Sequence, residues 1–208
     1  MLDCADSFAV SYSLSDYCLN RLPLIHASVV GTAGYVGGFC YNAPSLRAVF
    51  PDLPQRFGSC AEDGVLGPIV GIIGSLQAQM TLAVITKQFS SPLGQLVTCD
   101  AIENRFGGFR FDGAEEPDAS LAFISPQQIK SSDLVIDLRA ANEADLITAD
   151  AQRLGFDQIT PDLPLKGVGH VVFCCRSGQR AWAAAEKLSR FWSGSISLIA
   201  AGDPNFMR

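Results

Sequence analysis

The sequence predicts an α/β fold made of two unequal parts. An acidic segment rich in turn formers, residues 112–120, divides the 208-residue chain. Strand-like and helix-like segments alternate after it, which favours a parallel sheet flanked by helices. The composition, 48% hydrophobic and 17% charged, is typical of a globular chain that can bury a sizeable core. We therefore expect a first domain at 1–112, a linker at 113–120 and a second domain at 121–208.

Charge and cysteine content restrict the classes of partner and the compartment. Fifteen Lys and Arg against 21 Asp and Glu give a net charge of -6, and no basic run occurs. We expect neither nucleic acid nor an anionic membrane surface as a partner. Seven cysteines, an odd number without a secretory signal before them, argue against a disulfide framework. The predicted localisation is cytoplasmic.

The first part is expected to alternate helix and strand before ending in two strands. The expected elements are a short helix that includes residues 16–20, a strand at 23–30, a glycine-spaced turn and strand at 31–39, a proline-marked loop, a long apolar helix, and strands at 94–100 and 107–111. The residues 65–85 contain no charge and are numerous enough to span a bilayer. They also hold Pro68, three glycines and several polar residues, and no positive cluster flanks them, so a buried core or interface helix is the better interpretation. The apolar residues that share one side of this helix are Ile69, Ile72, Ile73, Leu76 and Met80.

The second part follows a strand, turn and helix pattern. Ser125 is expected to cap a helix that starts at Pro126, and residues 133–138 form a buried strand. A strand at 170–174, an amphipathic helix at 179–192 and a short strand at 196–199 follow. These elements predict a parallel sheet flanked by helices.

The loop between the 170–174 strand and the next helix is the strongest candidate site. It reads CRSGQR from Cys175 to Arg180, and it would hold the Cys175 sulfur above a helix N-terminus. Backbone N–H groups around Ser177, Gly178 and Gln179, with the cations Arg176 and Arg180 nearby, would favour the nucleophilic thiolate. The alternative is that Cys175 is a small buried hydrophobe, which is the role expected for Cys174.

This loop resembles the active-site loop of rhodanese-like sulfurtransferases, which is followed by an alanine-rich helix. Three further segments match that family: AWAAA at 181–185, DLR at 137–139 with Glu143, and LIAAG at 198–202. The resemblance covers about residues 121–205 and implies that Cys175 carries a persulfide, with no cofactor required. The family's Gly-His-Ile segment after its first strand is missing, so the domain is trimmed.

The first part is similar to the ThiF/MoeB-type adenylyltransferases, which activate the C-terminus of ubiquitin-like sulfur carrier proteins. The matching segments are SCAEDGVLG at 59–67, GIIGSLQA at 71–78, LDCADSFA at 2–9 and CDA at 99–101. The resemblance implies a homodimer, and it implies that Asp6 helps to hold ATP and Mg²⁺ and that Cys60 links to the carrier or receives sulfur. From the residues alone, Asp6 is equally a helix N-cap, and Cys60 is structural.

Several features of that family are absent. No Gly-x-Gly-x-x-Gly loop precedes Asp6, and Ser11 occupies the position of an ATP-gripping arginine. Ser45 and Ala48 replace the first pair of zinc-binding cysteines, and no Cys-x-x-Cys occurs, so no zinc site is expected. His26 and His170 are isolated and are expected to be packed or surface residues. Adenylyltransferase activity is therefore expected to be lost in this chain alone.

Together these observations give two hypotheses. The first is an enzyme that transfers sulfur through a Cys175 persulfide to a ubiquitin-like sulfur carrier, in thiamine or molybdopterin biosynthesis, attached to an incomplete carrier-adenylating domain. The second is a non-catalytic module that dimerises or docks the carrier through the apolar helix. The intact cysteine loop favours the first hypothesis.

Overall fold

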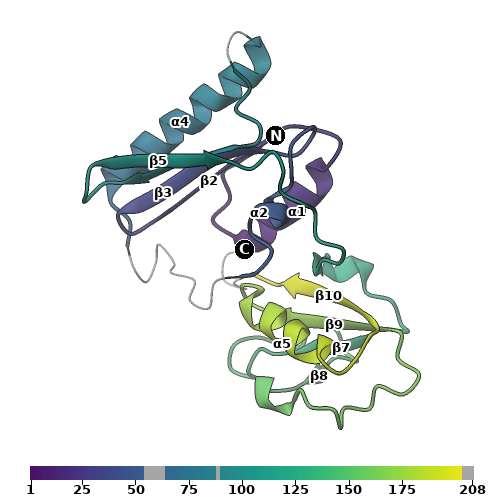
Figure 1. Cartoon of the computed structure of the whole chain (residues 1–208). Helices are drawn as coiled ribbons and strands as arrows, with labels where there is room; N and C mark the ends of the chain where they lie inside the picture. Colours follow the sequence, from purple (N-terminus) through teal and green to yellow (C-terminus); the bar gives the residue numbers. More distant parts are fainter. Residues whose placement is uncertain (54–63, 88–89, 203–208) are drawn as a thin grey trace. The chain divides into compact units, whose positions relative to one another are not determined.

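The computed structural model describes residues 1–53, 64–87 and 90–202. The chain folds into two compact units, Met1–Asp118 and Ala119–Arg208 (Figure 1). Each unit is built around its own five-stranded sheet. The predicted α/β class is confirmed, and the units are taken in turn.

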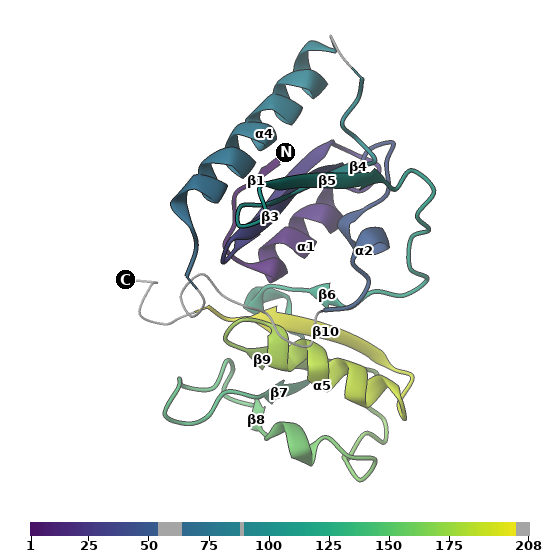
Figure 2. The same cartoon turned by 60° about the vertical axis from the view of Figure 1, so that its left-hand side comes forward.

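The first unit has a mixed sheet in the order β1-β2-β3-β4-β5 (Figure 2). Its strands are β1 (Leu2–Asp3), β2 (Leu24–Val30), β3 (Ala33–Phe39), β4 (Gln95–Asp100) and β5 (Arg105–Arg110). The β1 and β2 strands are parallel, and every later pair is antiparallel. Consecutive residues of a strand point to opposite faces, so Leu24 and Ile25 belong to two different hydrophobic clusters.

Helices cover both faces of this sheet. The helices α1 (Phe8–Cys18) and α2 (Leu46–Val49) contribute Cys18 and Leu46 to the cluster that contains Leu24. The long helix α4 (Gly67–Thr86) contributes Ile69, Ile73 and Met80 to the opposite cluster. The short helix expected to include residues 16–20 is α1, which begins at Phe8 and already ends at Cys18. The buried side of α1 carries small and polar residues as well as apolar ones, so the sequence lacks the regular spacing of apolar residues that predicts a helix.

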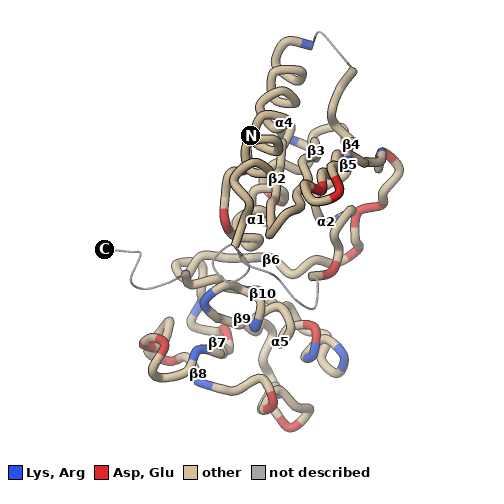
Figure 3. Tube along the Cα trace, turned by 90° about the vertical axis from the view of Figure 1, so that its left-hand side faces the viewer, with Lys and Arg blue, Asp and Glu red and all other residues tan. Residues whose placement is uncertain are grey.

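The apolar helix α4 is only partly covered in this chain. Its inner side packs on β2 and β3, and Gln77 donates hydrogen bonds to the carbonyl oxygens of Asp3 and Ile25, at 2.6 and 3.2 Å. Only 22% of its most apolar stretch is buried, and by length and composition alone the helix could cross a membrane. Ile72 is 37% exposed and is therefore not part of the core in this chain. Figure 3 shows no charged residue along α4 itself.

The second unit has a fully parallel sheet in the order β6-β10-β9-β7-β8, as predicted for this part of the chain. Its elements are β6 (Ala122–Phe123), the 3₁₀ turn η1 (Pro126–Gln128), β7 (Leu134–Asp137), β8 (Gln152–Arg153), η2 (Phe156–Gln158), β9 (His170–Cys175), α5 (Gln179–Ser189) and β10 (Ser195–Ala200). The α5 helix packs on β9 and β10. The helix expected after Ser125 is a single 3₁₀ turn.

Gln77 tests how α4 is held on its sheet. Replacing Gln77 with Met keeps the apolar stem but removes the amide that serves two buried carbonyl groups. Loss of a buried hydrogen bond leaves polar groups unsatisfied, so we expect the free energy of unfolding to fall by about 2 kcal/mol. Urea denaturation followed by circular dichroism measures this loss.

The neighbouring Gln79 is exposed and provides the matched control. Gln79→Met should leave the transition unchanged. Both tryptophans, Trp182 and Trp192, lie in the second unit, so the tryptophan fluorescence transition should not move in either variant. Equal stability of the two variants would contradict the role assigned to Gln77.

Candidate functional site: the Cys175 turn

Cys175 is the last residue of β9, at the carboxyl end of a parallel sheet, where ligands and reactive groups of α/β folds commonly lie. Its Sγ atom accepts two backbone hydrogen bonds, from Gly178 N–H at 3.1 Å and from Ala181 N–H at 3.3 Å. Both donors belong to the start of α5, whose N-terminus carries a partial positive charge. The arrangement therefore favours negative charge on the sulfur.

The turn is shorter than the six-residue loop that the sequence predicts. The strand continues through Cys175, and α5 already begins at Gln179 with Gly178 as its N-cap. Gly178 has φ 92°, a left-handed conformation that other residues rarely adopt, and this lets the chain reverse within three residues. Among the expected donors Ser177, Gly178 and Gln179, only Gly178 bonds the sulfur. The Gln179 N–H instead donates to the Ser177 hydroxyl, at 3.4 Å.

Ala181 is the donor that sequence reasoning missed. The first N–H groups of any helix lack partners within the helix, so a thiol placed over the first turn can accept one of them. An alanine carries no polar side chain, so nothing in its side chain marked Ala181 as a contact.

Arg180 donates its hydrogen bonds to a carboxylate and to a backbone carbonyl oxygen. Its guanidinium donates to Glu143 at 2.9 and 2.7 Å and to the Leu138 carbonyl oxygen at 2.9 Å. The hydrogen bond from Arg180 lowers the pKa of Glu143 to about 2. Most of the Arg180 charge is thus balanced by Glu143. Arg176, the other expected cation, is exposed on the turn.

A buried ion pair fixes the loop that receives Arg180. Asp137 accepts hydrogen bonds from the Arg139 backbone and guanidinium and from Ile147 N–H. Burial raises the pKa of Asp137, but these hydrogen bonds outweigh it and the pKa is lowered. Arg139 also donates to the Asp145 carbonyl oxygen at 2.8 Å. The loop after β7 is therefore tied down at both ends.

Cys174 is as fully buried as Cys175, but its side chain has different neighbours. It points to the opposite face of the sheet, into a cluster with Val172 and Ile199. Burial raises its pKa to about 12, so it stays a neutral thiol at physiological pH. The geometry agrees with a structural role for Cys174.

Of the two candidate residues of the first unit, Asp6 and Cys60, the structure describes only Asp6. Asp6 is exposed in the turn after β1, and the N-cap of α1 is Ser7 and not Asp6. Cys60 lies outside the described residues. Within the described ranges, no group of three His, Cys, Asp or Glu side chains is placed to hold a metal ion.

The position of the missing cysteines is occupied by a hydrogen-bonded clamp. Ser45 caps α2 by accepting the N–H groups of Arg47 and Ala48. The Glu116 carboxylate in turn accepts from the Ser45 N–H and hydroxyl, both at 2.6 Å. The clamp joins the start of α2 to the segment after β5 without a metal.

Both histidines are engaged by neighbouring side chains. His26 bonds the buried Asp3 carboxylate at 2.7 Å and the Tyr35 hydroxyl at 3.0 Å. His170 contacts Asp133 at 3.1 Å and the Ser197 hydroxyl at 3.0 Å. Each imidazole therefore has both nitrogens occupied by protein partners.

Residues 1–121 match the ThiF family, and the chain belongs to that family. This confirms the resemblance predicted for the first part. The match ends near the start of the second unit, so it does not bear on the Cys175 turn.

Two curated relatives carry the same double name. The chain is 36% identical over 115 residues to the adenylyltransferase and sulfurtransferase MOCS3 of Xenopus laevis, covering 53% of this chain and 26% of the relative. It is 38% identical over 90 residues to the adenylyltransferase and sulfurtransferase UBA4 of Meyerozyma guilliermondii, covering 41% and 21%. The matched part thus spans about a quarter of these proteins. The crystal structure of E. coli MccB with AMPCPP and MccA shares a TM-score of 0.45 at 18% identity, covering 58% of this chain and 38% of that one.

The Arg180–Glu143 pair predicts how the second unit responds to acid. Glu143 has a folded-state pKa of about 2 against an ordinary value of 4.5, so the pair stabilises the fold above pH 4.5. That stability is lost as the pH falls from 4.5 toward 2. Both side chains are partly exposed, which limits the contribution to about 1 kcal/mol. Urea denaturation followed by tryptophan fluorescence measures it.

Glu143→Gln should lower stability at pH 7 and flatten the acid dependence of the second unit. The matched control is Glu103→Gln, which breaks the more exposed Glu103–Arg105 pair of the first unit. That variant should leave the fluorescence transition unaltered. An unchanged acid slope in Glu143→Gln would show that the pair does not stabilise the turn.

Proposed function

We propose that the chain is a sulfurtransferase in which Cys175 carries a persulfide and passes its outer sulfur to the activated C-terminus of a ubiquitin-like sulfur carrier, in thiamine or molybdopterin biosynthesis. The observation that carries the proposal is the Cys175 Sγ atom bonded by two N–H groups at a helix start. The relatives of the first unit, whose names pair adenylyltransferase with sulfurtransferase, support the same assignment.

The chemistry needs a thiolate and a place for negative charge. The Cys175 thiolate attacks the outer sulfur of a donor such as thiosulfate, a new S–S bond forms, and sulfite leaves with the electron pair of the broken S–S bond. The Gly178 and Ala181 N–H groups stabilise the charged sulfur before and after this step, as preorganised donors do in oxyanion holes. Cyanide, as the acceptor in an assay, attacks the outer sulfur, leaves as thiocyanate and returns the electron pair of the S–S bond to Cys175 as a thiolate. With a carrier, the persulfide attacks the activated carbonyl carbon of the C-terminus, and the activating group leaves. A second thiol then attacks the Cys175 sulfur, which releases the carrier thiocarboxylate and leaves a disulfide for a reducing thiol to cleave. No cofactor is required.

The second unit would then be a rhodanese-like domain. Three features support this assignment: the fully parallel sheet, the CRSGQR segment at a strand's carboxyl end, and the Arg180–Glu143 contact between α5 and the loop after β7. Free thiols suit this chemistry, and the six described cysteines are free. A cytoplasmic location would keep them reduced.

Substrate access requires the turn to move. Cys175 is fully buried, while Arg176 and Ser177 above it are exposed. A small outward shift of these two residues would open the sulfur from the side of the turn. Arg176 would then offer a positive charge to an anionic donor.

Adenylation of the carrier by this chain alone does not fit the residues present. The family resemblance implies that ATP and Mg²⁺ bind near Asp6. In the described part of the chain, Asp6 offers one exposed carboxylate at that position. Ser11, in the position of the family's arginine, is buried and donates its hydroxyl to the Ser7 carbonyl oxygen at 3.2 Å. We therefore route no step through ATP.

A non-catalytic module remains the second candidate, and α4 is the observation that favours it. Its outward side exposes Val70, Leu82 and Ile85, at 45%, 53% and 70%. A Cβ added at Gly71 or Gly74 would meet nothing within 4 Å, so another backbone could approach closely. This surface suits a homodimer with the α4 of a second copy, and the dimer is compatible with either candidate function.

A thiosulfate-to-cyanide assay separates the two candidates. The full chain should form thiocyanate, and Cys175→Ser should reduce the rate to the uncatalysed background, because a serine hydroxyl cannot carry a transferable sulfur. Cys174→Ala is the matched control and should keep most of the activity, since Cys174 faces the opposite cluster.

Circular dichroism of each variant checks that the fold persists. Equal rates of thiocyanate formation by the full chain and by folded Cys175→Ser protein would overturn the sulfurtransferase proposal. The non-catalytic module would then be the remaining candidate.

A further inference from the structure

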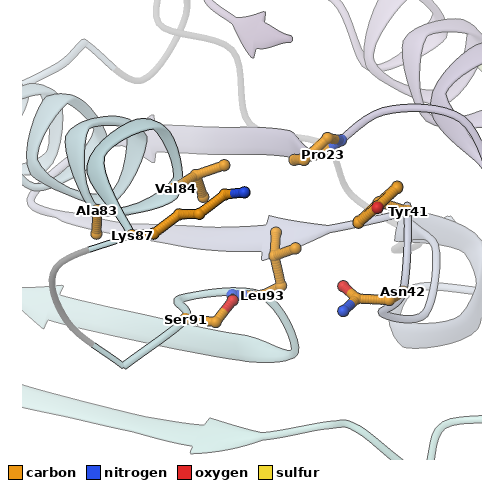
Figure 4. Close-up of a pocket in the computed structure, with 8 residues that line it drawn as sticks. All are labelled: Pro23, Tyr41, Asn42, Ala83, Val84, Lys87, Ser91 and Leu93. Atoms are coloured by element: carbon orange, nitrogen blue, oxygen red, sulfur yellow. The ribbon is translucent and has the colours of Figure 1, made fainter.

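The first unit contains a pocket that the sulfur chemistry does not use. It lies beside the C-terminal end of α4 and has a volume of about 390 Å³, within the range of small-molecule sites. Its lining residues are Pro23, Tyr41, Asn42, Ala83, Val84, Lys87, Ser91 and Leu93 (Figure 4). They come from segments far apart in the sequence: the entry to β2, the turn after β3, the end of α4 and the entry to β4.

The lining combines an apolar wall with a few polar groups. Pro23, Val84 and Leu93 offer carbon surface, and Leu93 is only 8% exposed, so the wall is continuous with the core behind it. Lys87, Ser91 and Asn42 bring an ammonium, a hydroxyl and an amide to the same space. Figure 4 shows the Lys87 side chain extended toward the middle of the lining residues. This combination is typical of sites for small amphiphilic molecules.

The charge of the pocket is positive although the chain as a whole is negative. Among the eight described lining residues, Lys87 is the one charged residue and none carries a carboxylate. Lys87 is the C-cap of α4, where the helix dipole favours an ammonium group. Because a full positive charge exceeds the partial charge of a helix end, the ammonium can still attract an anion.

The backbone beside the pocket is held in an uncommon conformation. Tyr41 has φ 63° and Lys87 has φ 54°, both in the left-handed region. For Lys87 this is an ordinary way to end a helix. For Tyr41 it is unfavourable, and the adjacent Cys40, at φ 64°, shares the strain. Hydrogen bonds from Cys40 N–H to Pro44 O and from Ala43 N–H to Cys40 O hold this turn and present Tyr41 to the pocket. Such strain is concentrated at functional sites.

We propose that this pocket binds a small organic carboxylate with a short apolar body. The carboxylate pairs with the Lys87 ammonium and accepts hydrogen bonds from Ser91 and Asn42. The apolar body lies against Val84, Leu93 and Pro23, with the Tyr41 ring at the rim. The pocket does not include Cys175. The proposed carboxylate binding is therefore tested separately from the proposed sulfur transfer.

The test uses the full chain and 4-phenylbutyrate as the probe. In a ¹⁵N–¹H NMR titration, the amide signals of Val84, Ser91 and Leu93 should shift in a saturable manner. The neutral 4-phenylbutan-1-ol, which has the same apolar body, should bind at least about tenfold more weakly, as expected for loss of a charged hydrogen bond.

Two lysine variants make the test specific. Lys87→Gln should weaken phenylbutyrate binding about tenfold and leave the alcohol unaffected, and Lys87→Arg should retain binding. Lys166→Gln, at an exposed position of the second unit, is the matched control and should bind as the unmodified chain does. Equal binding of acid and alcohol, or an unchanged affinity in Lys87→Gln, would overturn the proposal, as would shifts confined to residues outside the pocket.

Discussion

The candidate site of the second unit depends on two hydrogen bonds from the start of α5 to the Cys175 sulfur. They require the parallel strand β9 to end directly beneath a helix N-terminus, and they require a left-handed residue to turn the chain between them. Gly178 supplies that residue. The hydrophobic packing of α5 against β9 and β10 then holds the helix start in place. The chemistry of the turn thus depends on the core below it.

The electrostatic surroundings of this turn are set by contacts between segments distant in sequence. Arg180 is committed to Glu143, and Asp137 and Arg139 neutralise each other beneath them. The hydrogen bonds to the sulfur thus come from neutral backbone N–H groups, and Arg176 is exposed beside them. Cys174, one residue away, packs in an apolar cluster, and burial raises its pKa. Adjacent thiols in one strand have opposite environments because a strand alternates its faces.

Local signals in the sequence were sufficient for the strands and helices around the site. The apolar run before Cys175 and the amphipathic pattern after it predicted β9 and α5, with errors of one to three residues at their ends. The partner of Arg180 and the Ala181 donor could not be predicted, because the first is a contact across 37 residues and the second is a backbone group.

In the first unit, the start of α1 was missed because its buried side includes Ser11 and Ser15. The partial exposure of α4 could not be deduced from an apolar composition that fits a core, an interface and a membrane equally. Ser45 was known to replace a cysteine, but its clamp with Glu116 joins residues 71 positions apart.

The central claim is that Cys175, and no other cysteine, accepts sulfur. Mass spectrometry of peptides from the full chain after exposure to thiosulfate, with alkylation to trap persulfides, tests it most directly. The account predicts one added sulfur atom on the peptide that contains Cys175, and none on Cys175→Ser protein. Added sulfur on Cys4 or another cysteine, with Cys175 unmodified, would contradict it.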